Sequence, residues 1–157
     1  MTSPLVLRRA TPADAATLMA FNAALAFESE GKTLDAATLA AGVAAVLGDP
    51  RKGFYTLALR DGIPVGQTSI TYEWSDWRNG WYWWIQSVYV HASARRGGVF
   101  SAIYRHLEAE ARAAGDVIGL RLYVERDNER AQATYAKLGM DLEPYFLMGR
   151  YPLSPPV

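Results

Sequence analysis

Residues 81–101 read WYWWIQSVYVHASARRGGVFS, and this stretch gives the main evidence for the fold class. Its first half is rich in aromatic and β-branched residues, which is typical of a β-strand. Side chains alternate along a strand, so Tyr82 and Trp84 would point to one face and Trp83 and Ile85 to the other. A strand that is apolar on both faces is expected in the middle of a sheet covered by helices on both sides.

The second half of the stretch runs through a turn with two arginines and two glycines, residues 95–98, into a predicted helix. A strand that enters a glycine turn and then a helix presents several backbone N–H groups at one point, and the helix dipole adds partial positive charge there. Such a site suits a diphosphate group. The glycines alone leave two interpretations open: an anion-binding loop or an ordinary strand–helix connection.

Local signals on both sides of residues 81–101 predict the remaining helices and strands. Thr11-Pro12-Ala13-Asp14 is typical of a helix start, and Asp61-Gly62 of a hairpin turn. The expected strands are 5–7, 54–59, 63–72, 81–90, 117–124 and 145–151, and the expected helices are 11–27, 34–47, 98–113 and 128–138. The predicted fold class is α/β: a mixed sheet sandwiched by helices, in the order β-α-α-β-β-β-α-β-α-β.

Length and composition exclude several classes of function. The 157 residues suit a single domain over residues 1–157, and the absence of cysteine excludes disulfides and thiolate chemistry. Sixteen basic and sixteen acidic residues balance, so no nucleic-acid or membrane partner is expected. His91 and His106 are too sparse for a metal cluster, so no metal is expected. With no signal-like N-terminus, the predicted location is cytoplasmic.

The segment from Arg95 to Phe100 resembles the acetyl-CoA signature of the GNAT superfamily of N-acetyltransferases, Gln/Arg-x-x-Gly-x-Gly/Ala. Arg95 and Gly98 match its first two fixed positions, whereas Phe100 departs from the third. The resemblance implies that the backbone of 88–90 pairs with the pantetheine arm of acetyl-CoA. It also implies that 96–101 wrap the diphosphate.

A second match lies downstream, where Asn128, Tyr135 and Gly139 fall at the spacing of the family's Asn-x-x-Ala-x-x-x-Tyr-x-x-x-Gly-Phe segment, with Met140 replacing the phenylalanine. Asn128 is expected to cap a helix and, by the resemblance, to contact the cofactor. Tyr135 is then the candidate general acid that protonates the leaving thiolate, because a phenol stays neutral at pH 7 and can donate a proton. The cofactor-binding residues implied in all are Val88, Tyr89, Val90, Arg95, Arg96, Gly97, Gly98, Val99, Phe100, Ser101, Asn128 and Tyr135.

Within the superfamily, the chain resembles the spermidine/spermine (diamine) acetyltransferases. Leu25-Ala26-Phe27-Glu28 is similar to the end of their first helix, where a glutamate binds the polyamine, and Asp76 falls at their turn aspartate. Gln86 occupies the position at which those enzymes carry a glutamate that is taken as the general base. An amide cannot usefully accept a proton, so the base must be another group or a water chain.

The acceptor is expected to be a small primary amine, such as a polyamine, acetylated by direct transfer. An alkylamine arrives protonated, with a pKa of about 10, so carboxylates could attract it and carry its proton away. The predicted acceptor residues are Glu28, Trp74, Asp76, Trp77 and Gln86, with Glu73 as a catalytic carboxylate. Trp74 and Trp77 are the expected pocket walls.

Two alternatives remain open from the sequence. The acceptor could be a protein or peptide amine, which would need an open groove rather than an aromatic pocket. The chain could also be a non-catalytic acyl-CoA sensor; Tyr135 argues against this, whereas Gln86 keeps it open. Members of the family often form homodimers, so the oligomeric state is open as well.

Overall fold

The structure is a computed structural model that describes residues 3–153 of the chain. It divides into two compact units, one ending at Tyr123 and the other beginning at Val124. The elements of the first unit are β1 (Leu5–Arg9), η1 (Pro12–Asp14), α1 (Ala15–Glu30), α2 (Ala36–Gly48), β2 (Phe54–Arg60), β3 (Ile63–Ser75), β4 (Gly80–Val90), η2 (Ala92–Ala94), α3 (Val99–Ala114) and β5 (Val117–Leu122); α4 (Glu129–Lys137) belongs to the second.

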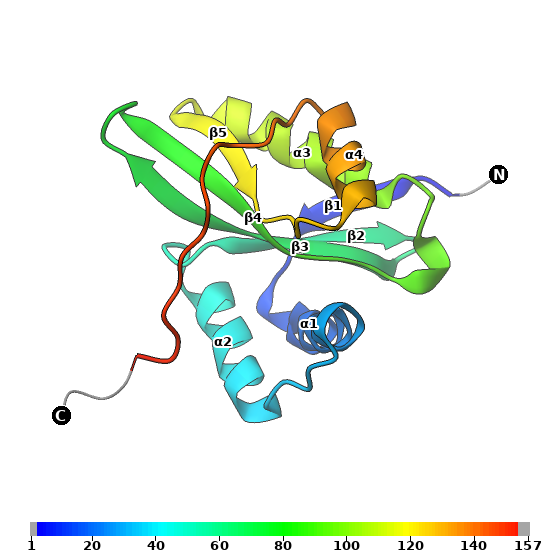
Figure 1. Ribbon diagram of the computed structural model, residues 1–157. Coiled ribbons are helices and arrows are strands. Elements are labelled where there is room, and N and C mark those ends of the chain that lie inside the picture. Colours follow the sequence, from blue (N-terminus) through cyan, green and yellow to red (C-terminus); the bar gives the residue numbers. More distant parts are fainter. Residues whose placement is uncertain (1–2, 154–157) are drawn as a thin grey trace. The chain divides into compact units, whose positions relative to one another are not determined.

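The first unit is a mixed sheet in the order β1-β2-β3-β4-β5. Neighbouring strands are antiparallel except for β4 and β5, which are parallel because α3 connects them. Helices α1 and α2 cover one face of the sheet and α3 covers the other (Figure 1). The predicted mixed sheet between helices is therefore confirmed, as is the place of β4 inside it.

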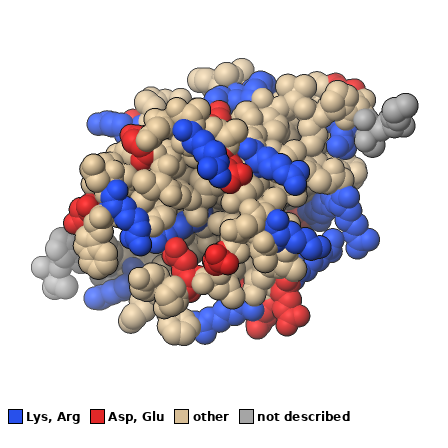
Figure 2. All heavy atoms as spheres, turned by 90° about the horizontal axis from the view of Figure 1, so that it is seen from above, with Lys and Arg blue, Asp and Glu red and all other residues tan. Residues whose placement is uncertain are grey.

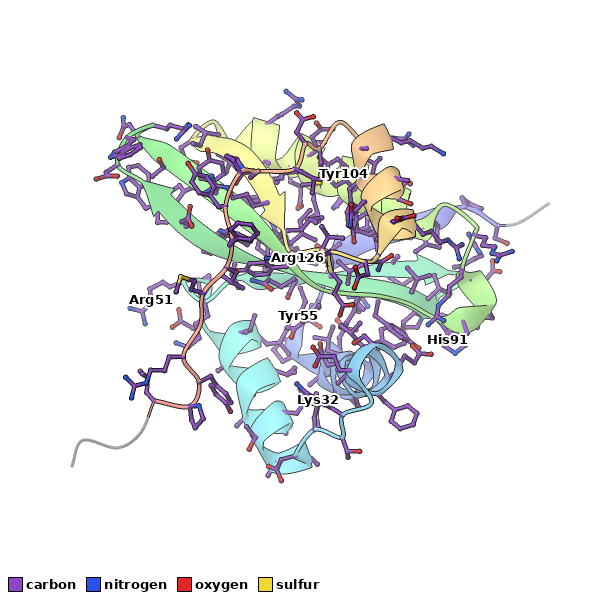
Figure 3. The ribbon with its side chains drawn as sticks, in the orientation of Figure 1. Lys32, Arg51, Tyr55, His91, Tyr104 and Arg126 are labelled. Atoms are coloured by element: carbon purple, nitrogen blue, oxygen red, sulfur yellow. The ribbon has the colours of Figure 1, made fainter. Side chains whose placement is uncertain are left out.

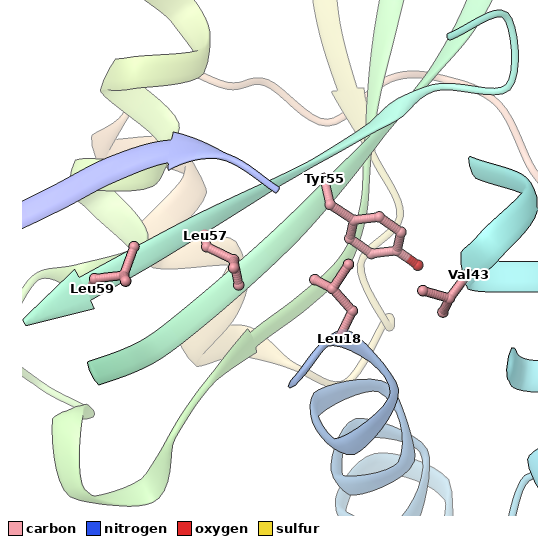
Figure 4. Close-up of a cluster of buried hydrophobic side chains, with 5 residues drawn as sticks. All are labelled: Leu18, Val43, Tyr55, Leu57 and Leu59. Atoms are coloured by element: carbon pink, nitrogen blue, oxygen red, sulfur yellow. The ribbon is translucent and has the colours of Figure 1, made fainter. Parts of the chain in front are cut away.

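The core on the α1 and α2 face is built on alternate residues of β2. Tyr55, Leu57 and Leu59 pack with Leu18 of α1 and Val43 of α2 (Figure 4). Figure 3 shows the Tyr55 ring between the sheet and these helices. Leu18 and Leu57 are fully buried, which fixes α1 against the sheet.

Helix α3 is held on the other face through a close approach to β3. A side chain at Gly66 would place its Cβ 3.1 Å from Cγ1 of Val99 and 3.6 Å from Cδ1 of Ile103. Val99, Ile103 and Leu107 form the buried stripe of the helix. The first turn of α3 is thus packed firmly on the sheet, and this fixes the loop that precedes it.

In the second unit, α4 begins at a side-chain cap. Oδ1 of Asn128 accepts a hydrogen bond from the N–H of Ala131 at 3.0 Å, as predicted for a helix N-cap. The helix ends where Gly139 adopts a φ of 92° and Met140 donates its N–H to the carbonyl of Tyr135 at 3.1 Å. The prediction of a single domain over 1–157 stays a prediction.

The expected closing strand over 145–151 is wrong, since the structure gives these residues no strand. Phe146 is 78% exposed and Met148 is 92% exposed. Apolar and aromatic composition favours a strand, but a strand forms only where a neighbour completes its backbone hydrogen bonds, and local sequence does not encode that neighbour. Strand β3 also runs further than expected, to Ser75, and β5 ends earlier, at Leu122.

Candidate active site

Strand β4 separates from β5 halfway along its length. The two strands pair from Trp81 to Ile85, where Ile85 lies opposite Leu122, whereas pairing with β3 continues to Val90. The β4 segment from Gln86 to Val90 therefore has one edge outside any ladder of the described sheet. Such an edge can pair with an extended ligand through backbone N–H and C=O groups.

A bulge marks the point of separation. Ser69 pairs with Gln86 but Gln67 pairs with Tyr89, so β4 carries one extra residue there, and Ser87 has a φ of 51°. Two buried side chains of β3 satisfy the displaced carbonyls: Oγ1 of Thr68 donates to the carbonyl of Gln86 at 2.9 Å, and Nε2 of Gln67 donates to that of Ser87 at 3.3 Å. No sequence motif marks Thr68 or Gln67, so these two residues could not be predicted.

The loop after β4 leads into the first turn of α3 through two left-handed residues. Arg96 has a φ of 63° and Gly98, the N-cap residue, a φ of 74°. Nothing lies within 4 Å of the position that a Cβ on Gly98 would take, so the glycine serves the backbone conformation and leaves open space. The open N–H groups of α3 face this loop, and they favour an anion.

Arg95, just before this loop, turns its side chain back onto the end of β4. Its Nε donates to the carbonyl of Val90 at 2.9 Å, and its Nη2 binds Oε2 of Glu28 at 2.8 Å. The guanidinium carbon also lies 5.7 Å from the centre of the Tyr89 ring. Glu28, predicted to hold the acceptor amine, is therefore paired with an arginine of the predicted cofactor segment.

The open part of β4 shares a sheet face with an aromatic and charged cluster. Gln86 lies opposite Ser69, and Ser69 opposite Tyr55, so its side chain is on the α1 and α2 face. Nε2 of Gln86 donates to Oγ1 of Thr71 at 3.3 Å. Residues at alternate positions of β4, namely Tyr82 and Trp84, point to the same face.

On this face, Arg121 of β5 connects the cluster. Its guanidinium carbon lies 3.6 Å from the centre of the Tyr82 ring, and its Nη1 lies 2.6 Å from Oε2 of Glu73. Trp84 and Tyr123 stack with ring centres 4.6 Å apart. We call Glu73, Tyr82, Trp84, Arg121 and Tyr123 the aromatic cluster.

Glu73 is distant from the bulge. It lies opposite Tyr82, whereas Gln86 lies opposite Ser69, four positions away on β3 and so about 13 Å along the strand. A proton could reach Glu73 from the bulge only through intervening groups or water.

The other predicted acceptor residues do not gather with Gln86. Trp74 lies opposite Trp81 and packs against it, on the sheet face opposite to Glu73. Asp76 accepts a hydrogen bond at Oδ1 from the N–H of Trp77 at 2.9 Å within the β3–β4 turn. The Trp77 side chain is 88% exposed, so no described residue packs around it as a pocket would.

In the second unit, Asn128 and Tyr135 lie on α4 at its N-cap and in its last turn. Tyr135 is partly buried, and this burial raises the pKa of its phenol above the ordinary value. The phenol therefore stays protonated at neutral pH, as a proton donor must.

Neither a metal-ligand cluster nor a membrane-spanning helix is found within residues 3–153. Residues 3–153 include no group of three or more His, Cys, Asp or Glu side chains placed to hold a metal ion. None of the helices in that range combines the length and the apolar character needed to span a bilayer. Basic and acidic side chains are interspersed over the face seen in Figure 2.

The sequence of the chain matches a known protein family. The model of the acetyltransferase (GNAT) family matches residues 18–140. The chain belongs to the GNAT acetyltransferase family. It is therefore an acetyltransferase, as the sequence predicted.

Solved structures agree with this membership. A possible acetyltransferase from Clostridium difficile 630 is 42% identical, with 96% of this chain and 98% of that chain covered and a TM-score of 0.87. A predicted acetyltransferase from Clostridium acetobutylicum, solved with acetyl-CoA, is 16% identical over 94% of this chain and 96% of that chain, with a TM-score of 0.77. The latter shares the fold. A comparison with curated proteins gave no match, and the diamine resemblance stays a prediction.

The residues of the GNAT signature lie between the end of η2 and the first turn of α3. Gly98 occupies a position that needs a left-handed backbone, and Arg95 is held by Val90 and Glu28. Phe100, at the departing third position, packs near Tyr104 with ring centres 6.3 Å apart. The larger residue is thus accommodated on α3.

Proposed function

We propose that this GNAT acetyltransferase takes its acetyl group from acetyl-CoA and transfers it directly to a small primary amine. The observation that supports acetyl-CoA as the acetyl donor is the open edge of β4 beyond Ile85, which leads into the loop before α3. The solved relative with acetyl-CoA supports the same donor through the shared fold.

The residues present fit acetyl-CoA in two ways. The edge from Gln86 to Val90 can pair with the amides of an extended pantetheine arm, because the bulge carbonyls are already satisfied from β3. The loop supplies N–H groups, the Arg96 guanidinium and the open space at Gly98 for a diphosphate. We assign 88–90 to the arm and 96–101 to the diphosphate.

Bound acetyl-CoA supplies the acetyl group as a thioester. The chain's own part is to hold the acceptor, to remove a proton from its nitrogen and to return a proton to the sulfur. We assign the last task to Tyr135, with Asn128 at the start of the same helix as a further cofactor contact. Gln86 cannot accept a proton, so the proton of the amine leaves through water, with Glu73 as the predicted final acceptor.

The aromatic cluster offers a small acceptor only those ring faces that Arg121 and the Trp84–Tyr123 stack leave uncovered. An ammonium is attracted to such faces, and Glu73 adds a carboxylate beside them. The pairing of Glu73 with Arg121 means that this carboxylate is already balanced by a cation. Roles for Trp74, Asp76 and Trp77 in acceptor binding stay predictions, as does the cytoplasmic location.

The test is acetyl-CoA turnover with a panel of amines, read by release of the CoA thiol and by the mass of the product. The panel includes diamines, small aromatic amines and a lysine peptide. We expect N-acetylation of at least one small amine with a higher kcat/KM than the peptide. Turnover of the peptide alone would contradict the small-amine proposal, and no thiol release with any amine would contradict the transfer itself.

A further inference from the structure

The Arg95–Glu28 ion pair joins the end of β4 to the last turn of α1. Nη2 of Arg95 lies 2.8 Å from Oε2 of Glu28, while Nε of the same guanidinium binds the carbonyl of Val90 at 2.9 Å. One side chain thus contacts two elements far apart in the sequence. The guanidinium fork allows this because it presents donors in a fixed plane.

Helix α1 offers the carboxylate from a fixed position. Leu18 is fully buried in the core, and Phe21 packs on Tyr89 of β4 with ring centres 5.1 Å apart. Glu28 lies in the last turn, where the helix dipole disfavours a negative charge. Arg95 offsets this unfavourable placement, so the pair stabilises the two residues where they are.

The pair acts directly before the most constrained part of the loop. Arg96 and Gly98, which follow Arg95, both have positive φ values, 63° and 74°. These two residues orient the N–H groups offered to a diphosphate, and their geometry depends on where the chain enters the loop. Arg95, bound at both Val90 and Glu28, fixes that entry point.

We infer that Glu28 is a positioning residue for the cofactor loop, acting through Arg95, rather than a ligand of the acceptor amine. This inference rests on the proposed function, since it assigns a role toward acetyl-CoA. It differs from the role that the diamine resemblance implies.

The sign of the effect separates positioning from plain charge. CoA is an anion, so removing a nearby carboxylate would by Coulomb attraction alone tighten its binding. If the carboxylate holds the loop in place, its removal weakens CoA binding instead. If Glu28 instead bound the acceptor amine, its removal would leave CoA binding unchanged and would raise the KM of the amine.

The experiment measures the Kd of CoA by calorimetry and the KM of the amine in Glu28→Gln. Glu30→Gln is the matched control, because Glu30 lies two residues on in the same helix and pairs with Lys32 at 3.2 Å on the surface. Since the Glu28 and Arg95 side chains are 42% and 47% exposed, the expected loss of CoA affinity in Glu28→Gln is modest, about threefold. Glu30→Gln should leave the Kd unchanged, and neither variant should change the KM of the amine.

A double-mutant cycle shows whether Glu28 acts through Arg95. Arg95→Gln should also weaken CoA binding, and adding Glu28→Gln to it should have no further effect, because the pair is already broken. Additive losses, tighter CoA binding in Glu28→Gln, or a raised KM of the amine at constant Kd would each overturn the inference. A wild-type protein that does not bind CoA would refute the proposed function itself, which is a different result from an unchanged Kd in Glu28→Gln.

Discussion

Tyr135 is the residue on which the proposed proton transfer to sulfur depends. Tyr135→Phe removes the phenol oxygen and keeps the ring, so the packing of α4 should persist. We expect kcat to fall about 10²-fold, within the range of general acid catalysis, with little change in the Kd of acetyl-CoA. Because burial raises the pKa of this phenol above its ordinary value, its deprotonation should not limit the rate at mildly alkaline pH. A loss of kcat below about threefold would point to another proton donor.

Gly98 tests the diphosphate loop at a single position. Gly98→Glu places a negative charge and a side chain where the anion is proposed to bind, and we expect CoA binding to be lost. The left-handed φ of 74° also strains any larger residue, so Gly98→Asn is the control, since asparagine tolerates this conformation without charge. Calorimetry on folded protein decides: equal CoA affinity in the glutamate and asparagine variants would exclude a diphosphate here.

Gln86 determines the expected pH dependence of the reaction. Without an internal base at this position, the kcat/KM of an alkylamine should rise with pH toward the amine pKa of about 10, as more neutral amine appears. Gln86→Glu restores a carboxylate beside Thr71, where the amide now binds at 3.3 Å. We expect the variant to reach its plateau at lower pH than the wild type. Identical pH profiles would show that position 86 is not where the proton leaves.

The bulge of β4 is supported by hydrogen-bond donors from β3. Thr68→Val removes the hydroxyl that donates to the carbonyl of Gln86 at 2.9 Å. The loss of that bond leaves a partly buried carbonyl with one donor fewer and should cost about 1 kcal/mol of unfolding free energy. CoA affinity should fall as well, because the open edge loses its shape.

Thr56→Val is the control for this change. Thr56 lies opposite Thr68 on β2, is equally buried, and its Oγ1 has no hydrogen-bond partner among the described residues. Its substitution should be neutral or stabilising in denaturant unfolding. If both valine variants lose the same stability and affinity, the hydroxyl of Thr68 does not support the bulge.

The inner strand and the hairpin could be predicted from the sequence, whereas the bulge could not. The two-sided apolar pattern of 81–90 correctly predicted an inner strand, and Asp61-Gly62 a hairpin between β2 and β3. The bulge could not be predicted, because Ser87 carries no local signal for a positive φ. Since a bulge shifts the alternation, the faces of residues beyond it could not be assigned either.

The local geometry of the candidate site was predictable from short motifs, whereas its contacts between distant residues were not. The glycine turn and the Asn128 cap follow from short motifs, whereas the Arg95–Glu28 and Arg121–Glu73 pairs join residues far apart in sequence. Three carboxylates, Glu28, Glu73 and Asp76, were expected to lie in the acceptor region. Two of them, Glu28 and Glu73, are instead paired with arginines, and Asp76 binds a backbone N–H of its own turn.

Most of the proposed donor site lies in the first of the two units. The open edge of β4, the loop and the first turn of α3 all lie there, and α3 is fixed on the sheet through Gly66. The balance of sixteen basic and sixteen acidic residues gives no net charge to attract an anionic cofactor. We therefore expect CoA binding to depend on local hydrogen-bond donors rather than on the overall electrostatic field.

Acetyl-CoA is proposed to bind along the open edge of β4 and at the loop before α3. Titration of the isotopically labelled protein with CoA, followed by the backbone amide signals in NMR, tests it residue by residue. We predict that amides of 88–90 and 96–101 shift together and saturate with one Kd, while those of β1 and α2 stay in place. Saturable shifts confined to other parts of the sheet, or no shifts at all, would contradict this binding mode.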